Sequence, residues 1–132
     1  LRKKTMINAL YENPYVYILK EEASIPWVKI FTKTPYKELS QCDEATREAI
    51  LRAMLIVEKT MLAFYNPDKI NIALFGNYVP HVHIHVMARY KEDSHFPESM
   101  WGVKQREGNV KLPSFEAFVG LLCENLDKEF CL

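Results

Sequence analysis

The sequence lacks an excess of charge, a long hydrophobic run and a disulfide pattern, and each absence excludes a class of protein. Lysine plus arginine and aspartate plus glutamate number 17 each, so the net charge gives no reason to expect binding to nucleic acid or to a membrane surface. No apolar run approaches the roughly 18 to 20 residues that span a membrane. The cysteines Cys42, Cys123 and Cys131 are odd in number and have no metal-binding spacing, which fits a reducing compartment. We therefore expect a cytoplasmic protein.

The sequence does contain enough apolar side chains for one hydrophobic core. Its 132 residues are 48% apolar and 26% charged, which is typical of a soluble globular protein. No internal repeat or low-complexity segment divides the chain. We predict a single domain over residues 1–132.

Four segments have the composition of β-strands. Residues 15–19 and 27–32 are rich in aromatic and β-branched side chains and are separated by a polar turn, which predicts paired strands. Residues 70–74 predict a third strand, and residues 81–89 a fourth that follows a tight connection at residues 76–77. The last two strands are therefore predicted to form a hairpin.

Apolar residues recur at helical spacing in two other places. One helix is predicted from about Asp43 to about Tyr65, with Asp43 or Ser40 as its N-cap. The following Asn-Pro pair ends it, because proline disfavours helical geometry in the residue before it. A second helix is predicted to begin at Ser114, with an apolar stripe along one face. Residues 91–113 have few periodic apolar positions and predict a long loop, which in a compact domain is usually functional or mobile.

Three of the four histidines stand in the heptapeptide HVHIHVM, residues 81–87. Successive side chains of a strand point to opposite faces, so His81, His83 and His85 form one row and the branched residues between them form another. The apolar row is expected to face the core. The imidazole row is then expected to face away from it, toward solvent, a pocket or a partner subunit.

Two chemistries compete for this row of imidazoles. Imidazoles two residues apart bind transition metals, but the first and third histidines lie roughly 13 Å apart along the strand, too far for both to reach one ion. A neutral imidazole also attacks phosphorus centres, provided that one ring nitrogen is free and an acceptor holds the other. The middle histidine fits the second chemistry more naturally. Metal binding and nucleotide binding without turnover remain open as alternatives.

The heptapeptide resembles the His-φ-His-φ-His-φ-φ signature (φ apolar) of the histidine-triad, or HIT, superfamily of nucleotide hydrolases and transferases. The order of elements over residues 10–90 resembles the family as well. The resemblance implies an α+β fold, with an antiparallel five-stranded sheet packed with a long helix and a C-terminal helix, and with two sheets joined in a homodimer. It implies an enzyme that cleaves a dinucleoside polyphosphate or a nucleoside phosphoramidate at the α-phosphate, through a nucleotidyl-histidine intermediate and without a metal or other cofactor.

The resemblance also implies residue roles. Carried over by position, it makes His83 the nucleophile, has His85 contact the phosphate, and puts His81 in the network that supports His83.

Further positions are expected to bind the substrate. Asn71 and the backbone around Gly76 and Asn77 match positions that approach the phosphates in the family. Trp101 lies in a segment that resembles a short bacterial branch, where it is expected either to cover a base or to anchor the loop. Arg89 is expected on the same strand face as His85, where its guanidinium suits either phosphate or solvent.

The sequence departs from the family pattern around this predicted site. Pro26 and Trp27 stand where members often have a Gly-His pair, and Lys20 stands where many have an aspartate that binds ribose. Tyr78 replaces a small hydroxyl residue. The change at Tyr78 predicts a reshaped pocket on the leaving-group side.

Overall fold

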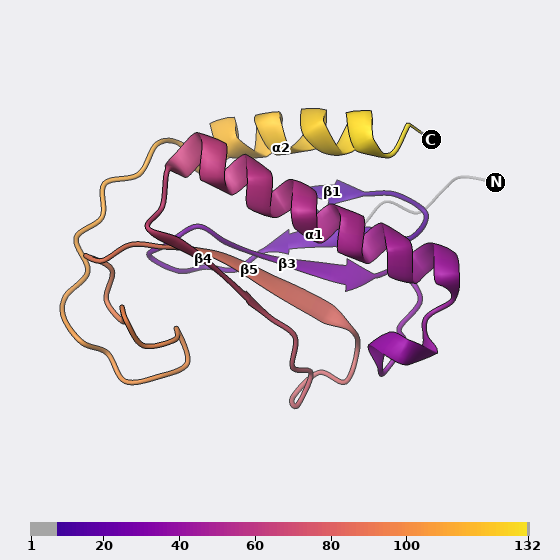
Figure 1. Cartoon of the computed structure of the whole chain (residues 1–132), viewed down its shortest axis with the longest axis horizontal. Helices are drawn as coiled ribbons and strands as arrows, with labels where there is room; N and C mark the ends of the chain where they lie inside the picture. The colour runs from indigo at the N-terminus through magenta and orange to yellow at the C-terminus, as the bar shows by residue number, and fades with distance from the viewer. Residues whose placement is uncertain (1–7, 132) are drawn as a thin grey trace.

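The computed structural model describes residues 8–131, over which a five-stranded antiparallel sheet is covered by helices (Figure 1). The strands are β1 (Tyr11–Glu12), β2 (Val16–Lys20), β3 (Trp27–Thr32), β4 (Lys69–Ala73) and β5 (His83–Arg89), in the spatial order β1-β2-β3-β5-β4. The helices are the short 3₁₀ helix η1 (Leu39–Gln41), α1 (Glu44–Tyr65) and α2 (Phe115–Glu129). This arrangement confirms the predicted α+β fold with a long helix and a C-terminal helix.

Helix α1 begins and ends where the sequence predicts. The Asp43 carboxylate accepts a hydrogen bond from the backbone N–H of Thr46 at 2.8 Å, which satisfies one of the free donors of the first turn. After Tyr65 the chain turns into the left-handed region at Asn66, where φ is 48°, and Pro67 follows. Asparagine tolerates this conformation, and proline cannot continue the helix.

The central strands β3 and β5 give the sheet two different faces. Val28 pairs with Val86 and Ile30 pairs with Ile84, and these side chains belong to the buried core on which α1 packs. Trp27, His83 and His85 occupy the other positions of the two strands and therefore point to the opposite face. The alternation in the sequence correctly predicts that the branched row faces the core.

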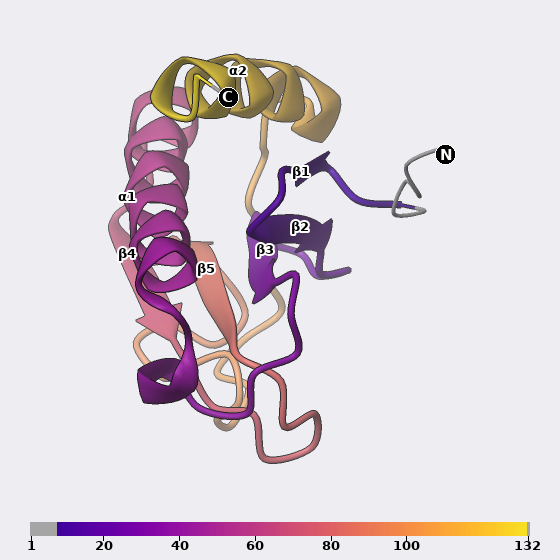
Figure 2. The ribbon, with the colours of Figure 1, turned by 90° about the vertical axis from the view of Figure 1, so that its right-hand side faces the viewer.

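Helix α2 completes the core by packing on α1 (Figures 1 and 2). The Ser114 hydroxyl caps it by accepting from the Ala117 N–H at 3.3 Å. Phe118, Leu122 and Leu126 are fully buried on one stripe, as their helical spacing predicts.

Two local predictions need correction. Strand β1 was not predicted, because two residues are too short for a periodic pattern. The connection between β4 and β5 is no tight turn but runs over residues 74–82, so β5 begins at His83 and His81 precedes the strand. The imidazole face agrees with one of the three expected surroundings, a pocket: His83 and His85 are each 8% exposed and line a cleft.

Residues 91–113 contain no helix or strand, as predicted, and they loop beyond the end of β5, at the left in Figure 1. None of the helices in the described part of the chain is long and apolar enough to cross a membrane. All three cysteines are free thiols.

Candidate active site

A cleft of about 360 Å³ opens beside the two histidines of β5. It lies on the face of the sheet that points away from α1, since His83 and His85 are on that face. The connection between β4 and β5 forms one wall, and a residue of the 91–113 loop forms another. The lining residues are Phe75, Gly76, Asn77, Tyr78, Val79, His83, His85 and Trp101.

The ring of His83 is held with one nitrogen engaged. Its Nδ1 lies 2.7 Å from the backbone oxygen of His81. A carbonyl oxygen only accepts, so Nδ1 carries the hydrogen and Nε2 keeps a free lone pair. Phe31 stacks on the ring at a centroid distance of 4.8 Å and an angle of 18°, which restricts its orientation. His83 therefore has the tautomer of a nucleophile.

The ring of His85 is held by a different partner. The indole Nε1 of Trp27 donates a hydrogen bond to His85 Nδ1 at 3.0 Å within the buried interior. Burial, together with the neighbouring charges of His83 and Lys29, lowers the pKa of His85 to about 4, against a smaller opposing effect of Glu21. His85 is therefore neutral at physiological pH.

His81 stands apart from the other two histidines. Its Nε2 lies 2.7 Å from the backbone oxygen of Thr32, and its ring packs edge-on against Phe31. It does not line the cleft, but its own backbone oxygen is the acceptor that holds His83. His81 lies before the strand begins, but its ring contacts the same Phe31 ring that stacks on His83.

The predicted phosphate-binding turn does line the cleft. Gly76 and Asn77 both belong to its wall. Gly76 has a φ of +95°, and a Cβ built there would lie 3.2 Å from the backbone oxygen of Val79. Only glycine adopts this conformation without strain, so the shape of this wall depends on the absence of a side chain.

Trp101 is brought back onto strand β5 by its loop. The centroid of its ring lies 4.9 Å from the ring centroids of both His85 and Phe75, with edge-to-face geometry in each case. The ring centroid of Trp27 lies 5.2 Å away. The side chain remains 48% exposed. An aromatic wall with one open surface is suited to stacking on a flat group of a ligand.

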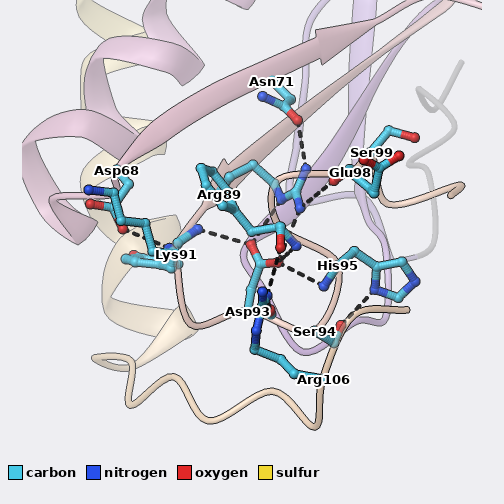
Figure 3. Close-up of polar contacts among 12 residues, drawn as sticks. Asp68, Asn71, Arg89, Lys91, Asp93, Ser94, His95, Glu98, Ser99 and Arg106 are labelled. Atoms are coloured by element: carbon cyan, nitrogen blue, oxygen red, sulfur yellow. Dashed lines mark hydrogen bonds and ion pairs between the residues drawn. The ribbon is translucent and has the colours of Figure 1, made fainter. Parts of the chain in front are cut away.

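Arg89 lies on the same strand face as His85, as expected, but it is neither solvated nor open to a ligand (Figure 3). The side chain is 1% exposed, and all three of its nitrogens donate hydrogen bonds within the protein. The acceptors are the Asp93 carboxylate, Asn71 Oδ1 and the backbone oxygen of Glu98. A buried guanidinium with these partners anchors the structure, which differs from the solvated charge that was one of its two expected roles.

The partner of Arg89 organises the following loop. The Asp93 carboxylate also accepts from the backbone N–H groups of Tyr90, His95 and Phe96. Burial by itself raises the pKa of this carboxyl, but the Arg89 and backbone hydrogen bonds outweigh it and lower the pKa to about 2.

A second arginine, Arg106, closes the loop by donating to the backbone oxygens of Asp93 and Phe96, each at 2.7 Å. The loop that carries Trp101 is therefore fixed to the end of β5.

Sequence reasoning missed two parts of this site. One is Asp93, for which the available signal is the Arg-x-x-x-Asp spacing that places it near a charge of opposite sign. The other is Phe75, which no pattern in the sequence identifies as a lining residue of the cleft. The sequence does draw attention to Trp27, because it stands where family members often have a histidine. Over residues 8–131, no cluster of three or more His, Cys, Asp or Glu side chains is arranged to hold a metal ion.

The comparisons with solved structures show what this fold is similar to. A histidine triad protein from Bradyrhizobium japonicum is 24% identical, with 92% of this chain and 90% of that chain covered and a TM-score of 0.69. A histidine triad (HIT) protein from Sinorhizobium meliloti 1021 is 21% identical, with coverage of 89% and 90% and a TM-score of 0.71. A zinc-bound histidine triad family protein from Mycobacterium smegmatis is 16% identical, with coverage of 95% and 87% and a TM-score of 0.57. At these identities the likeness is one of fold.

The comparison of sequences goes further than that of structures. No curated protein matches the chain. The family model described as "HIT domain" matches residues 2–92, which include β1 to β5, α1 and all three histidines of the heptapeptide. The chain therefore belongs to the HIT domain family.

Proposed function

We propose that this protein is a nucleotide hydrolase or nucleotidyl transferase that works through a covalent intermediate on His83. HIT family members are generally nucleotide-binding hydrolases or transferases. The observation that carries the proposal is the 2.7 Å hydrogen bond between His83 Nδ1 and the backbone oxygen of His81, because it leaves the lone pair of the neutral ring on Nε2 in a side chain that lines the cleft.

The chemistry has two steps. The Nε2 lone pair attacks the α-phosphorus of a nucleotide derivative, a nitrogen–phosphorus bond forms, and the bond to the leaving group breaks with its electron pair on the departing atom. Water or another acceptor then attacks the same phosphorus and frees His83. His85, whose ring centroid lies 5.0 Å from that of His83, is placed to donate a hydrogen bond to a phosphate oxygen.

The cleft supports a nucleotide-sized ligand. The wall at Gly76 and Asn77 brings backbone close to the histidines, and Phe75 and Trp101 offer aromatic surface. We propose that the phosphate lies between the histidines and this wall, and that a flat part of the substrate stacks on Trp101. The substrate classes are dinucleoside polyphosphates and nucleoside phosphoramidates. A phosphate contact by Asn71 remains a prediction, since its oxygen is bonded to Arg89.

The test is the covalent adduct itself. The purified protein is incubated with a diadenosine polyphosphate or an adenosine phosphoramidate, quenched in mild base and measured by intact mass. An AMP adduct that His83→Ala lacks, together with released AMP, is the expected result. Stabilisation by nucleotide without adduct or product would contradict the enzyme and favour a nucleotide-binding module. Elemental analysis of the same sample tests the metal-binding alternative, which predicts stoichiometric metal.

We also propose a cytoplasmic homodimer. Helix α1 exposes Leu51, Leu55 and Leu62, each between 38% and 47%, and the edge strand β4 exposes Ile72 at 42%. Large apolar side chains exposed on a helix and on an edge strand are suited to burial against a second copy. Sedimentation equilibrium at micromolar concentration is expected to give twice the monomer mass, and a monomer throughout would contradict the proposal.

A further inference from the structure

The two histidines of the cleft are held by partners of opposite kind. His83 Nδ1 faces a carbonyl oxygen, which accepts, whereas His85 Nδ1 faces the indole N–H of Trp27, which only donates. The nitrogen that meets an indole donor must present a lone pair. His85 therefore carries its hydrogen on Nε2, and the two neighbouring rings have opposite tautomers.

We propose that Trp27 is a positioning residue that holds His85 as a neutral ring with its hydrogen on Nε2, so that His85 meets the substrate as a hydrogen-bond donor and not as an imidazolium acid. This inference rests on the nucleotidyl transfer at His83 proposed above. Trp27 is suited to the role because it is 9% exposed and belongs to a small buried cluster with Ile25 and Met87. The indole cannot rotate away from His85 without opening that cluster.

Protonation of His85 would disrupt this arrangement. A second hydrogen on Nδ1 would point at the indole hydrogen across 3.0 Å and replace a hydrogen bond with a repulsive contact. The other groups around the ring are the His83 imidazole, the aromatic rings of Phe75 and Trp101, and the Lys29 ammonium, which is paired with Glu21 at 2.9 Å. Within the described residues, Glu21 is the one anionic group among these neighbours, and its pairing with Lys29 weakens its pull on a proton at His85.

The tautomer has a consequence for the leaving group. When the bond from phosphorus to the leaving group breaks, a departing amine must gain a proton, whereas a departing phosphate leaves as a stable anion. A neutral imidazole is a poor acid, so wild-type protein is expected to favour phosphate over amine leaving groups. Loss of the Trp27 hydrogen bond is expected to reduce that preference, because more His85 is then cationic.

Nitrogen-15 NMR of labelled protein tests the tautomer directly. The wild type is expected to show a bare Nδ1 and a protonated Nε2 at His85 that persist as the pH falls toward about 4. In Trp27→Phe, which fills most of the same space, the titration midpoint is expected to rise by about one pH unit, the effect of one lost hydrogen bond. Trp101→Phe is the matched control, because that ring contacts His85 without a hydrogen bond, and it is expected to keep the wild-type tautomer.

The functional readout is the ratio of kcat/KM for an adenosine phosphoramidate to that for a diadenosine polyphosphate. At pH 6 this ratio is expected to rise about tenfold in Trp27→Phe, in proportion to the imidazolium fraction. A wild-type His85 protonated on Nδ1, an unchanged midpoint in Trp27→Phe, or a shifted midpoint with an unchanged ratio would each overturn the inference. If neither substrate is turned over, the proposed function fails, while the NMR result still decides the tautomer.

Discussion

Replacement of Asp93 by alanine is expected to destabilise the protein more than any other single change in the 91–113 loop. The carboxylate accepts two hydrogen bonds from Arg89, at 2.9 and 3.1 Å, and three more from backbone N–H groups. Both side chains are at most 1% exposed. Removal of one partner leaves the buried guanidinium without its counter-ion, which costs about 3 to 5 kcal/mol. Because small domains are stable by only about 5 to 15 kcal/mol, the loss is a large fraction.

Two further variants separate charge from shape. Asp93→Asn keeps the size and most of the geometry but loses the charge, as protonation does. Protonation costs about 2.5 kcal/mol by linkage, because the pKa of the carboxyl is lowered from 3.8 to about 2. We expect a similar loss for Asp93→Asn. The double variant Asp93→Ala with Arg89→Met is expected to recover part of the loss, since it removes the unpaired charge.

Urea unfolding followed by circular dichroism measures these differences. Glu124→Ala is the matched control, because this carboxylate is 65% exposed and lies 3.9 Å from Lys128 in a surface pair, and it is expected to change the stability by less than about 0.5 kcal/mol. The contribution of Asp93 is fully present above its unfolded pKa of about 4 and disappears as the pH falls through about 2. A loss below about 1 kcal/mol in Asp93→Ala would refute the buried ion pair.

Three other changes have expected outcomes. Trp101→Ala is expected to lower kcat/KM about tenfold, which is the effect of losing one aromatic contact, while the global stability is retained. Trp101→Phe is expected to keep most of the activity, and equal losses in both variants would contradict stacking. Gly76→Ala is expected to destabilise the protein by about 1 to 2 kcal/mol and to lower turnover, because φ is +95° and the cleft wall must shift. Unchanged kinetics and an unchanged urea midpoint would show that the wall tolerates a side chain. Asp43→Ala is expected to cost about 1 kcal/mol through the lost cap while the AMP adduct still forms, and a stability equal to that of a Glu44→Ala control would show that the cap contributes nothing.

Much of the fold follows from local patterns. The end of α1 follows from the Asn-Pro pair, its beginning from the Asp43 cap, and the stripe of α2 from helical spacing. These features depend on residues within a few positions of one another, so the sequence is sufficient to predict them. Strand β1 could not be predicted in this way, since two residues carry no period and the strand exists only by pairing with β2.

The candidate site likewise has a part that the local sequence determines and a part that only tertiary packing decides. The alternation of HVHIHVM is a local property, and it determines that His83 and His85 share a face opposite the branched residues. The partners of those side chains are not local: the indole that bonds to His85 is 58 residues away in the sequence, and its position depends on the register of β3 against β5. The same holds for Arg89, which the sequence leaves open between phosphate and solvent. Its burial beneath the loop and its pairing with Asp93 depend on how the chain after β5 folds back, because a side chain takes the charge partner that tertiary packing brings to it.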